Sequence, residues 1–127
     1  MMIKMTKIKV LSIKQPWAEL IIKGQKTIEL RTTQRNYRGE LYIHSSKTPD
    51  NEAMKQFRYA QLLNGAIIGK VEFIDIKEYS NNNEFNKDKD KHLSNGELVK
   101  FGWIFKNPQR IKPVLTNGTL GIWEFEL

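Results

Sequence analysis

Hydrophobic and polar residues alternate along several short stretches of this chain, which is the period of a β-strand. The stretches that show this alternation, or a run of β-branched apolar residues, are 8–13, 27–31, 40–45, 66–76, 101–106, 110–115 and 120–126. Proline cannot donate to a strand ladder, so Pro108 is predicted to break the strand before it and Pro113 to lie at an edge or a bulge. We therefore predict about six strands, with Gly69 marking a bulge or a close backbone approach.

Residues 14–24 show a helical spacing of apolar positions instead, with Trp17 and Ile21 on one side of the predicted helix. Pro16 suits the first helical turn, where its missing N–H costs nothing. Gly24 suits the left-handed residue that commonly ends a helix. We predict a short helix of about two turns at this position.

Residues 48–65 carry the clearest helical pattern in the chain. Their apolar residues form a stripe made by Ala53, Met54, Phe57, Ala60 and Leu63. Thr48 or Asp50 can cap the start of this helix, and Asn64 with Gly65 can end it.

Residues 80–97 are polar and charged and contain almost no core-forming side chains, so we predict a mobile loop with a short helical turn at its end. Antiparallel strands with segregated helices define an α+β fold, and a small β-barrel of about six strands with two main flanking helices is the expected closure. A length of 127 residues fits one domain, 1–127, and no internal repeat or linker divides it.

The composition excludes several classes of protein. The chain has no cysteine, which rules out disulfides, thiolate catalysis and cysteine-ligated metals and suits a reducing cytosol. Its longest apolar runs are far shorter than a membrane span. The N-terminal residues 1–13 are basic and then apolar, but the apolar part is too short for a signal peptide, and we interpret it as a strand.

Positive charge is concentrated in the first part of the chain. The formal charge is +7; residues 1–70 carry 13 Lys and Arg against 5 Asp and Glu, whereas residues 71–127 carry 8 against 9. A basic bias of this kind favours anionic partners, with nucleic acid first among them. The alternative explanation is the lysine-rich and asparagine-rich proteome of an AT-rich genome.

No motif of classical hydrolases, nucleotidases or metalloenzymes is present. The chain contains neither a phosphate-binding G-x-x-x-x-G-K-[ST] loop nor a G-x-G-x-x-G fingerprint. His44 and His92 have no metal-ligand spacing between them, so no metal and no cofactor is expected. Two serines directly follow His44, but adjacent strand residues point to opposite faces, and no nucleophile elbow accompanies them.

A cluster of basic residues is the strongest chemical signal. It consists of Lys14, Lys26, Arg31, Arg35 and Arg38, with Gln15 beside them. Strand alternation puts Glu29 and Arg31 on one face, where Glu29 can orient Arg31 or accept from a nucleobase amine. Trp17 can either stack a base or anchor its helix in the core. Tyr37 lies between Arg35 and Arg38 and can extend a basic path.

The segment LSIKQPWAELIIKGQKTIELR (11–31) resembles the opening of the activating-signal-cointegrator homology (ASCH) domain. The G-x-K-x-x-E-x-R signature of that family stands here as Gly24, Lys26, Glu29 and Arg31. The resemblance continues, in the family's order, in YRGELYIHSS, GAIIGKVEFID, FGWIFKNPQRIKP and GTLGIWEFE. It therefore covers nearly the whole chain apart from residues 80–97 and the first few residues.

The resemblance implies a PUA-like barrel with a cleft that binds RNA or a nucleotide, a cytoplasmic setting, and a partner in translation or RNA processing. Some relatives are enzymes. One small bacterial group removes the acetyl group from acetylated cytidine with a lysine, a threonine and a glutamate. Lys26 matches that lysine, but Glu29 stands where that threonine is required. Other relatives have been linked to RNA cleavage.

We therefore predict a binding domain for RNA or a nucleotide-like ligand, without membrane association. Its predicted ligand-contacting residues are Ser12, Lys14, Gln15, Trp17, Lys26, Glu29, Arg31, Arg38 and His44. One alternative is an enzyme, an amidohydrolase of modified nucleosides or a ribonuclease, with Lys26 and Glu29 as proton carriers. A second alternative is a protein-interaction module that docks an acidic partner on the basic face.

Overall fold

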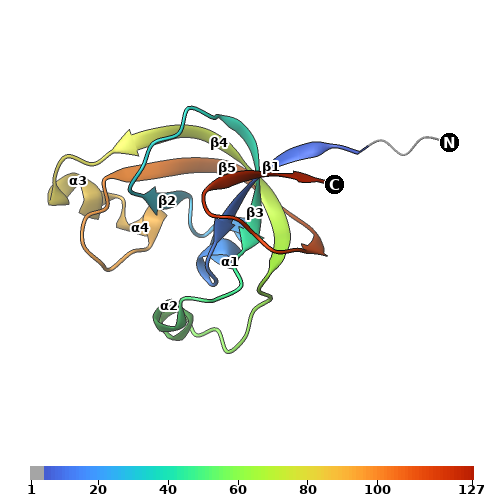
Figure 1. Cartoon of the computed structure of the whole chain (residues 1–127). Helices are drawn as coiled ribbons and strands as arrows, with labels where there is room; N and C mark the ends of the chain where they lie inside the picture. Colours follow the sequence, from blue (N-terminus) through green and yellow to red (C-terminus); the bar gives the residue numbers. More distant parts are fainter. Residues whose placement is uncertain (1–4) are drawn as a thin grey trace.

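The computed structural model describes residues 5–127, and its centre is one curled, six-stranded sheet that forms a half-barrel (Figure 1). The strands are β1 (Lys7–Ile13), β2 (Ile28–Arg31), β3 (Gly39–Ser45), β4 (Ala66–Glu78), β5 (Phe101–Leu115) and β6 (Ile122–Glu126). Their order across the sheet is β2-β5-β4-β3-β1-β6. The pair β1 and β3 is parallel and the other neighbouring pairs are antiparallel. The predicted α+β class and the small PUA-like, six-stranded architecture are confirmed.

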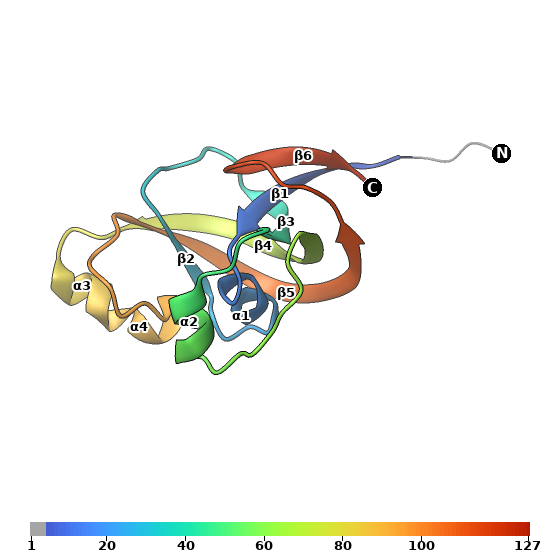
Figure 2. The same ribbon diagram turned by 60° about the horizontal axis from the view of Figure 1, so that its bottom comes forward.

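Four short helices accompany the sheet within the described residues, namely α1 (Trp17–Ile22), α2 (Asn51–Gln56), α3 (Asn82–Lys87) and α4 (Lys89–His92). Helix α1 lies inside the curve of the sheet and contacts β3, β4 and β5 (Figure 2). Most of its side chains are buried there, because the apolar residues cover more than one side of so short a helix. Gly24 follows with φ +80°, the left-handed conformation predicted for it. The predicted first strand begins at Lys7, and the part of it assigned to residues 1–4 lies outside the described residues.

The predicted helix over 48–65 is wrong beyond Gln56. Asp50 caps α2 as expected, since its side chain accepts from the backbone N–H of Ala53. The helix then ends, because Arg58 adopts a positive φ of 61° that no α-helix continues through. The segment that follows is held by tertiary contacts instead, and Leu63, expected on the apolar stripe, is 45% exposed.

The segment 80–97 was predicted as a loop with a short helical turn at its end, and the structure differs by containing two helices. Helices α3 and α4 lie in this segment, and Phe85 and His92 are buried with their rings stacked at 4.3 Å between centroids. Asn81 caps α3 by accepting from the backbone N–H of Glu84. The segment contains few apolar side chains because part of what it buries is polar and hydrogen-bonded.

Strand β5 runs through both prolines, so the expected break at Pro108 is wrong. The ladder with β4 shifts register between the pairs Glu72–Lys106 and Lys70–Gln109, which leaves Asn107 and Pro108 in a bulge. Strand β2 pairs only with 101–104, so Pro108 faces no second neighbour that needs its N–H. Pro113 falls at a further register shift, which agrees with the edge or bulge predicted for it.

Gly69 lies at a register shift in both its pairings and in close contact with β5, as predicted. A Cβ at this position would be 2.5 Å from the backbone oxygen of Gln109 and 2.6 Å from Cδ1 of Ile22.

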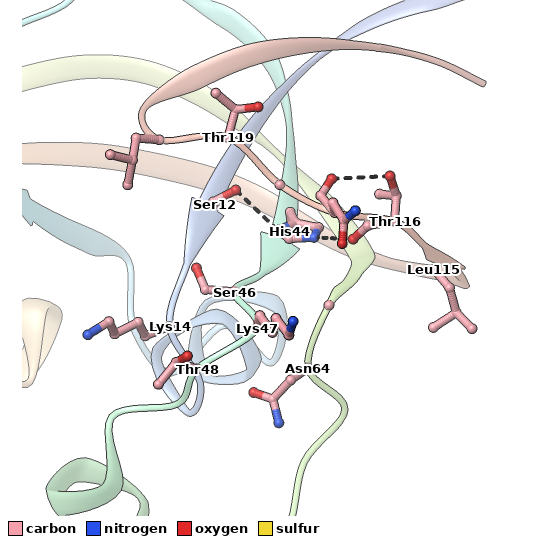
Figure 3. Close-up of a pocket in the computed structure, with 14 residues that line it drawn as sticks. Ser12, Lys14, His44, Ser46, Lys47, Thr48, Asn64, Leu115, Thr116 and Thr119 are labelled. Carbon is pink, nitrogen blue, oxygen red and sulfur yellow. Dashed lines mark hydrogen bonds between the residues drawn. The ribbon is translucent and has the colours of Figure 1, made fainter.

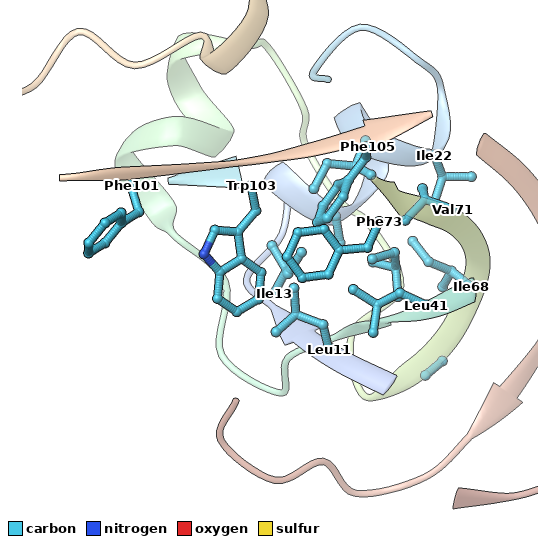
Figure 4. Close-up of a cluster of buried hydrophobic side chains, with 14 residues drawn as sticks. Leu11, Ile13, Ile22, Leu41, Ile68, Val71, Phe73, Phe101, Trp103 and Phe105 are labelled. Carbon is cyan, nitrogen blue, oxygen red and sulfur yellow. The ribbon is translucent and has the colours of Figure 1, made fainter. Parts of the chain in front are cut away.

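The larger of the two hydrophobic clusters is formed by aromatic rings and branched aliphatic side chains (Figure 4). At its centre, Trp103 and Phe73 stack at 4.9 Å between ring centroids.

Candidate functional site

Glu29 lies between the two bases of the G-x-K-x-x-E-x-R segment. Its Oε2 is 2.9 Å from Nη2 of Arg31, and its Oε1 is 3.6 Å from Nζ of Lys26. Strand alternation puts Glu29 and Arg31 on the same face of β2, so this part of the arrangement agrees with the sequence prediction. The single carboxylate thus pairs with both bases within the fold and offsets one of their two positive charges.

Lys26 is nearly inaccessible, with 3% of its surface exposed. Its Nζ donates a 2.7 Å hydrogen bond to the carbonyl oxygen of His92 and lies 5.0 Å from the ring centroid of Trp17. Burial lowers the pKa of Lys26, and the nearby Glu29 only partly offsets that effect. A lysine held in this way supports the structure around it and does not present its ammonium to solvent.

Arg31 connects this cluster to β1. Its guanidinium donates to the backbone oxygen of Ser12 at 3.1 Å and lies 5.7 Å from the ring centroid of Trp103. About a quarter of its side chain, 24%, remains exposed. Arg31 is therefore the signature base with the most access to a ligand.

Gln15 holds helix α1 against the segment after α2, and Trp17 holds it against the start of α2. Gln15 is 1% exposed; its side chain accepts from the backbone N–H of Glu19 and donates to the carbonyl of Leu63. The indole N–H of Trp17 donates to Oδ2 of Asp50 at 3.0 Å. Both residues were predicted to contact ligand, and in this structure their polar atoms are engaged within the protein.

A cavity of about 900 Å³ opens beside this cluster, between the ends of β1 and β3 and the loop before β6 (Figure 3). It is lined by Ser12, Lys14, His44, Ser46, Lys47, Thr48, Asn64, Gly65, Leu115, Thr116, Asn117, Gly118, Thr119 and Leu120. Lys14 and Lys47 are both exposed, and none of these described lining residues carries a carboxylate. The cavity thus has the electrostatic character that an anionic ligand requires.

Ser12 and His44 form a hydrogen-bonded pair at one end of the cavity. The parallel register of β1 and β3 places them side by side, and Ser12 Oγ is 3.1 Å from Nδ1 of His44. The other ring nitrogen of His44 is 2.8 Å from the carbonyl oxygen of Thr116, and the indole N–H of Trp123 donates to Ser12 Oγ at 3.0 Å. This chain of contacts fastens the loop before β6 to the centre of the sheet.

Three of the predicted ligand residues, Ser12, Lys14 and His44, therefore line one cavity. A neighbouring network is formed by Trp17, Lys26, Glu29 and Arg31, and it reaches this cavity through the contact from Arg31 to Ser12.

Arg38 belongs to neither group. Its guanidinium lies 4.9 Å from the ring centroid of Phe73 and donates to the carbonyls of Arg35 and Tyr37, while the Tyr37 hydroxyl donates to the carbonyl of Glu40.

Sequence reasoning missed Lys47 and the loop 116–120 as parts of the cavity. Lys47 lies three residues beyond His44, just after the predicted strand. This closeness to His44 was the one sign in the sequence that Lys47 could line the same cavity. No local pattern indicates that the loop lines the cavity, because its contact with Ser12 and His44 depends on where β6 pairs.

A second polar cluster surrounds Asp88 at the helices α3 and α4. Tyr79 donates to Asp88 Oδ2 at 2.6 Å, and Lys77 donates to the same oxygen at 2.8 Å. Burial alone would raise the pKa of Asp88, but these hydrogen bonds and the charge of Lys77 outweigh it and lower that pKa. Burial and the contact with Asp88 raise the pKa of Tyr79. This cluster joins the segment 80–97 to the end of β4.

Within residues 5–127, no three His, Asp or Glu side chains are arranged to hold a metal ion. The same part of the chain contains no helix whose length and apolar character would let it cross a membrane.

Comparisons with known proteins agree with this fold. The family model of the ASCH domain matches residues 11–115. The human protein "Activating signal cointegrator 1" is 27% identical over 131 residues, an alignment that covers 91% of this chain and 22% of the human protein. The chain thus spans about a fifth of that relative's length.

Among solved structures, ASCH from Zymomonas mobilis superposes with a TM-score of 0.62 at 15% identity, covering 84% of this chain and 72% of the other. A mutant of that protein with one tyrosine replaced by phenylalanine gives a TM-score of 0.62 at 16% identity, with 87% and 76% coverage. At this level of identity the likeness shows a shared fold.

Proposed function

Because this chain belongs to the ASCH domain family, we propose that it binds RNA or a nucleotide-like ligand in the cavity beside Ser12, Lys14, His44 and Lys47. One observation carries the proposal: the cavity has two exposed lysines and no carboxylate among the described residues that line it. Its volume of about 900 Å³ lies in the range of pockets that hold small organic ligands.

In this proposal Lys14 and Lys47 contact phosphate groups. Both ammonium groups are on flexible, exposed side chains, which suits contact with a charged backbone whose exact path varies. The basic excess of residues 1–70 adds a longer-range attraction for the same partner. The proposal includes a cytoplasmic setting and a role near translation or RNA processing.

The signature residues act mainly as supports in this proposal. Lys26 and Glu29 are buried and paired, and Arg31 positions the cavity wall by donating to the backbone oxygen of Ser12. Arg31 keeps enough exposure to contact a phosphate at the edge of the site. Lys26 was predicted to contact the ligand, but in this proposal the exposed Lys47 contacts phosphate in its place.

An enzymatic role is the second candidate, and one observation favours it. Burial lowers the pKa of Lys26 toward neutral pH, where its amine can act as a proton donor or acceptor in catalysis. Lys26 is 3% exposed and donates to the carbonyl of His92, so this role requires α4 to move away. Binding requires no such movement.

The experiment that tests the proposal measures binding of fluorescent single-stranded RNA, duplex RNA and tRNA by polarisation. Salt is varied from about 50 mM to about 200 mM, and we expect the affinity to fall steeply over that range because contacts with phosphates release counterions. Absence of binding by all three RNAs at the lowest salt, together with absence of binding by free nucleotides, would reject the proposal.

A further inference from the structure

At the Ser12 end of the cavity, the N–H and O–H protons of the Ser12, His44 and Trp123 side chains are already donated in hydrogen bonds within the protein. The Thr116 carbonyl can only accept, so the His44 Nε2 atom that lies 2.8 Å from it carries a proton and donates it. In the neutral ring, Nδ1 then lacks a proton and accepts the Ser12 hydroxyl at 3.1 Å. The Trp123 indole N–H can only donate, and it donates to Ser12 Oγ at 3.0 Å.

Ser12 Oγ is therefore left with one free lone pair and no free proton. Ser12 and His44 both line the cavity, so this end of it offers a hydrogen-bond acceptor and no side-chain donor from either residue. A ligand group that brings its own proton is satisfied here. A ligand carbonyl would place two acceptors against each other, with no proton between them.

Gly118 packs directly against the Ser12–His44 pair, so only a residue without a side chain fits beside it. A Cβ at this position would lie 2.6 Å from Ser12 Oγ and 2.6 Å from Nδ1 of His44. The φ of Gly118 is outside the positive range, so the need for glycine here comes from space and not from backbone conformation.

From this proton inventory we infer that the cavity selects nucleotides whose base carries an exocyclic amine, and that the Ser12–His44 pair is the element that reads it. Cytosine and adenine present such a donor, whereas uracil and hypoxanthine present a carbonyl oxygen at the same ring position. The inference rests on the proposed function, since Lys14 and Lys47 supply the phosphate contacts that bring a nucleotide to this end of the cavity.

The test compares two matched pairs of ligands, CMP with UMP and AMP with IMP. Dissociation constants are measured on the full chain by NMR titration at pH 8. We expect the amine member of each pair to bind roughly tenfold more tightly, the size of one well-formed base contact.

Two variants separate the inference from a general effect on folding. His44→Leu removes the acceptor of the Ser12 hydroxyl, so its proton becomes free to donate into the cavity, and the amine preference should disappear or invert. Gly118→Ala brings a Cβ to within 2.6 Å of Ser12 Oγ and of the His44 ring, so the pair must shift, and the ratio within each ligand pair should fall toward one. Thermal unfolding checks that each variant folds, and Gly118→Ala keeps the test decisive if His44→Leu does not fold.

The outcomes also distinguish this inference from the proposed function. Equal affinity within both ligand pairs, with binding still weakened by Lys14→Ala, would overturn the inference and leave the proposed function standing. An amine preference that His44→Leu and Gly118→Ala both leave unchanged would overturn the role of the Ser12–His44 pair. Failure of all four nucleotides and of RNA to bind would reject both.

Discussion

The ammonium group of Lys26 donates a 2.7 Å hydrogen bond to the carbonyl of His92, a residue 66 positions further along the chain. This contact joins the signature segment to α4, the helix that ends at His92. The backbone adds to it, since the N–H of Thr27 donates to the carbonyl of Lys91 at 3.0 Å. The signature lysine and the segment 80–97 therefore form one structural unit.

Replacing Lys26 by methionine should destabilise that unit. The Lys26→Met side chain keeps its length but leaves the His92 carbonyl without its donor and Glu29 with Arg31 alone. We expect a loss of about 2 kcal/mol in the free energy of unfolding, the usual cost of removing a charged hydrogen-bond partner. Denaturant unfolding measures the loss, and hydrogen exchange should show reduced protection in α3 and α4.

Lys55→Ala is the matched control, because Lys55 is an exposed lysine on α2. Its effect on stability should stay within about 0.5 kcal/mol. Equal stability of Lys26→Met and the wild-type protein would contradict the structural role assigned to Lys26.

Asp88 should make stability depend on acid pH. Hydrogen bonds from Lys77 and Tyr79 lower the folded-state pKa of Asp88, so its contribution is complete above the unfolded-state pKa of about 3.9. The contribution is lost as pH falls through the lower, folded-state pKa. Asp88→Asn should therefore be less stable than the wild type at neutral pH, by about 2 kcal/mol, and the difference should narrow below about pH 4.

Urea unfolding at a series of pH values measures this difference. Asp90→Asn provides the control, since Asp90 lies two residues away in the same segment and is exposed. A gap between wild type and Asp88→Asn that stays constant down to strongly acid pH would show that Asp88 is not the titrating group.

Gly69→Ala should be destabilising although alanine is a small residue. Its Cβ would lie 2.5 Å from the backbone oxygen of Gln109, and backbone cannot rotate away as a flexible side chain can. We expect a cost of about 1–3 kcal/mol, typical of overpacking. Gly96→Ala is the comparison, because the nearest atom there, Ser94 Oγ, is 3.4 Å away. Thermal unfolding of the two variants should differ clearly, and identical melting curves would contradict the close β4–β5 approach.

Lys14→Ala and Lys47→Ala should each weaken RNA binding by the same mechanism. If each ammonium neutralises one phosphate, the slope of log affinity against log salt should flatten by roughly one for each lysine removed. Lys55→Ala should leave the slope unchanged. Polarisation titrations at several salt concentrations measure the slopes, and unchanged slopes in both variants would place the phosphate contacts elsewhere.

Local patterns in the sequence predicted the elements that depend on neighbouring residues. The alternation around Glu29 and Arg31 predicted their shared face, and the 2.9 Å contact between them confirms it. Gly24 was predicted to end α1 in a left-handed conformation, and its φ is +80°. Such features follow from backbone periods and steric limits that act over a few residues.

Burial of polar groups could not be predicted in the same way. The segment 80–97 has too few apolar residues to indicate a packed structure, yet Asp88 and His92 are buried because Tyr79, Lys77 and Phe85 supply their hydrogen-bond partners. Sequence hydrophobicity does not reveal such pairs, since it describes single residues and not which polar groups meet in the fold.

By itself, then, the sequence determined the six strands, the first helix, the family and the basic character of the first part of the chain. Only the tertiary structure decided which of those basic residues remain accessible. Burial and the His92 carbonyl engage Lys26, whereas Lys14 and Lys47 stay exposed beside a cavity. The parallel pairing of β1 with β3 brought Ser12 to His44 across 32 positions, a contact set by strand register between distant segments and by no local pattern.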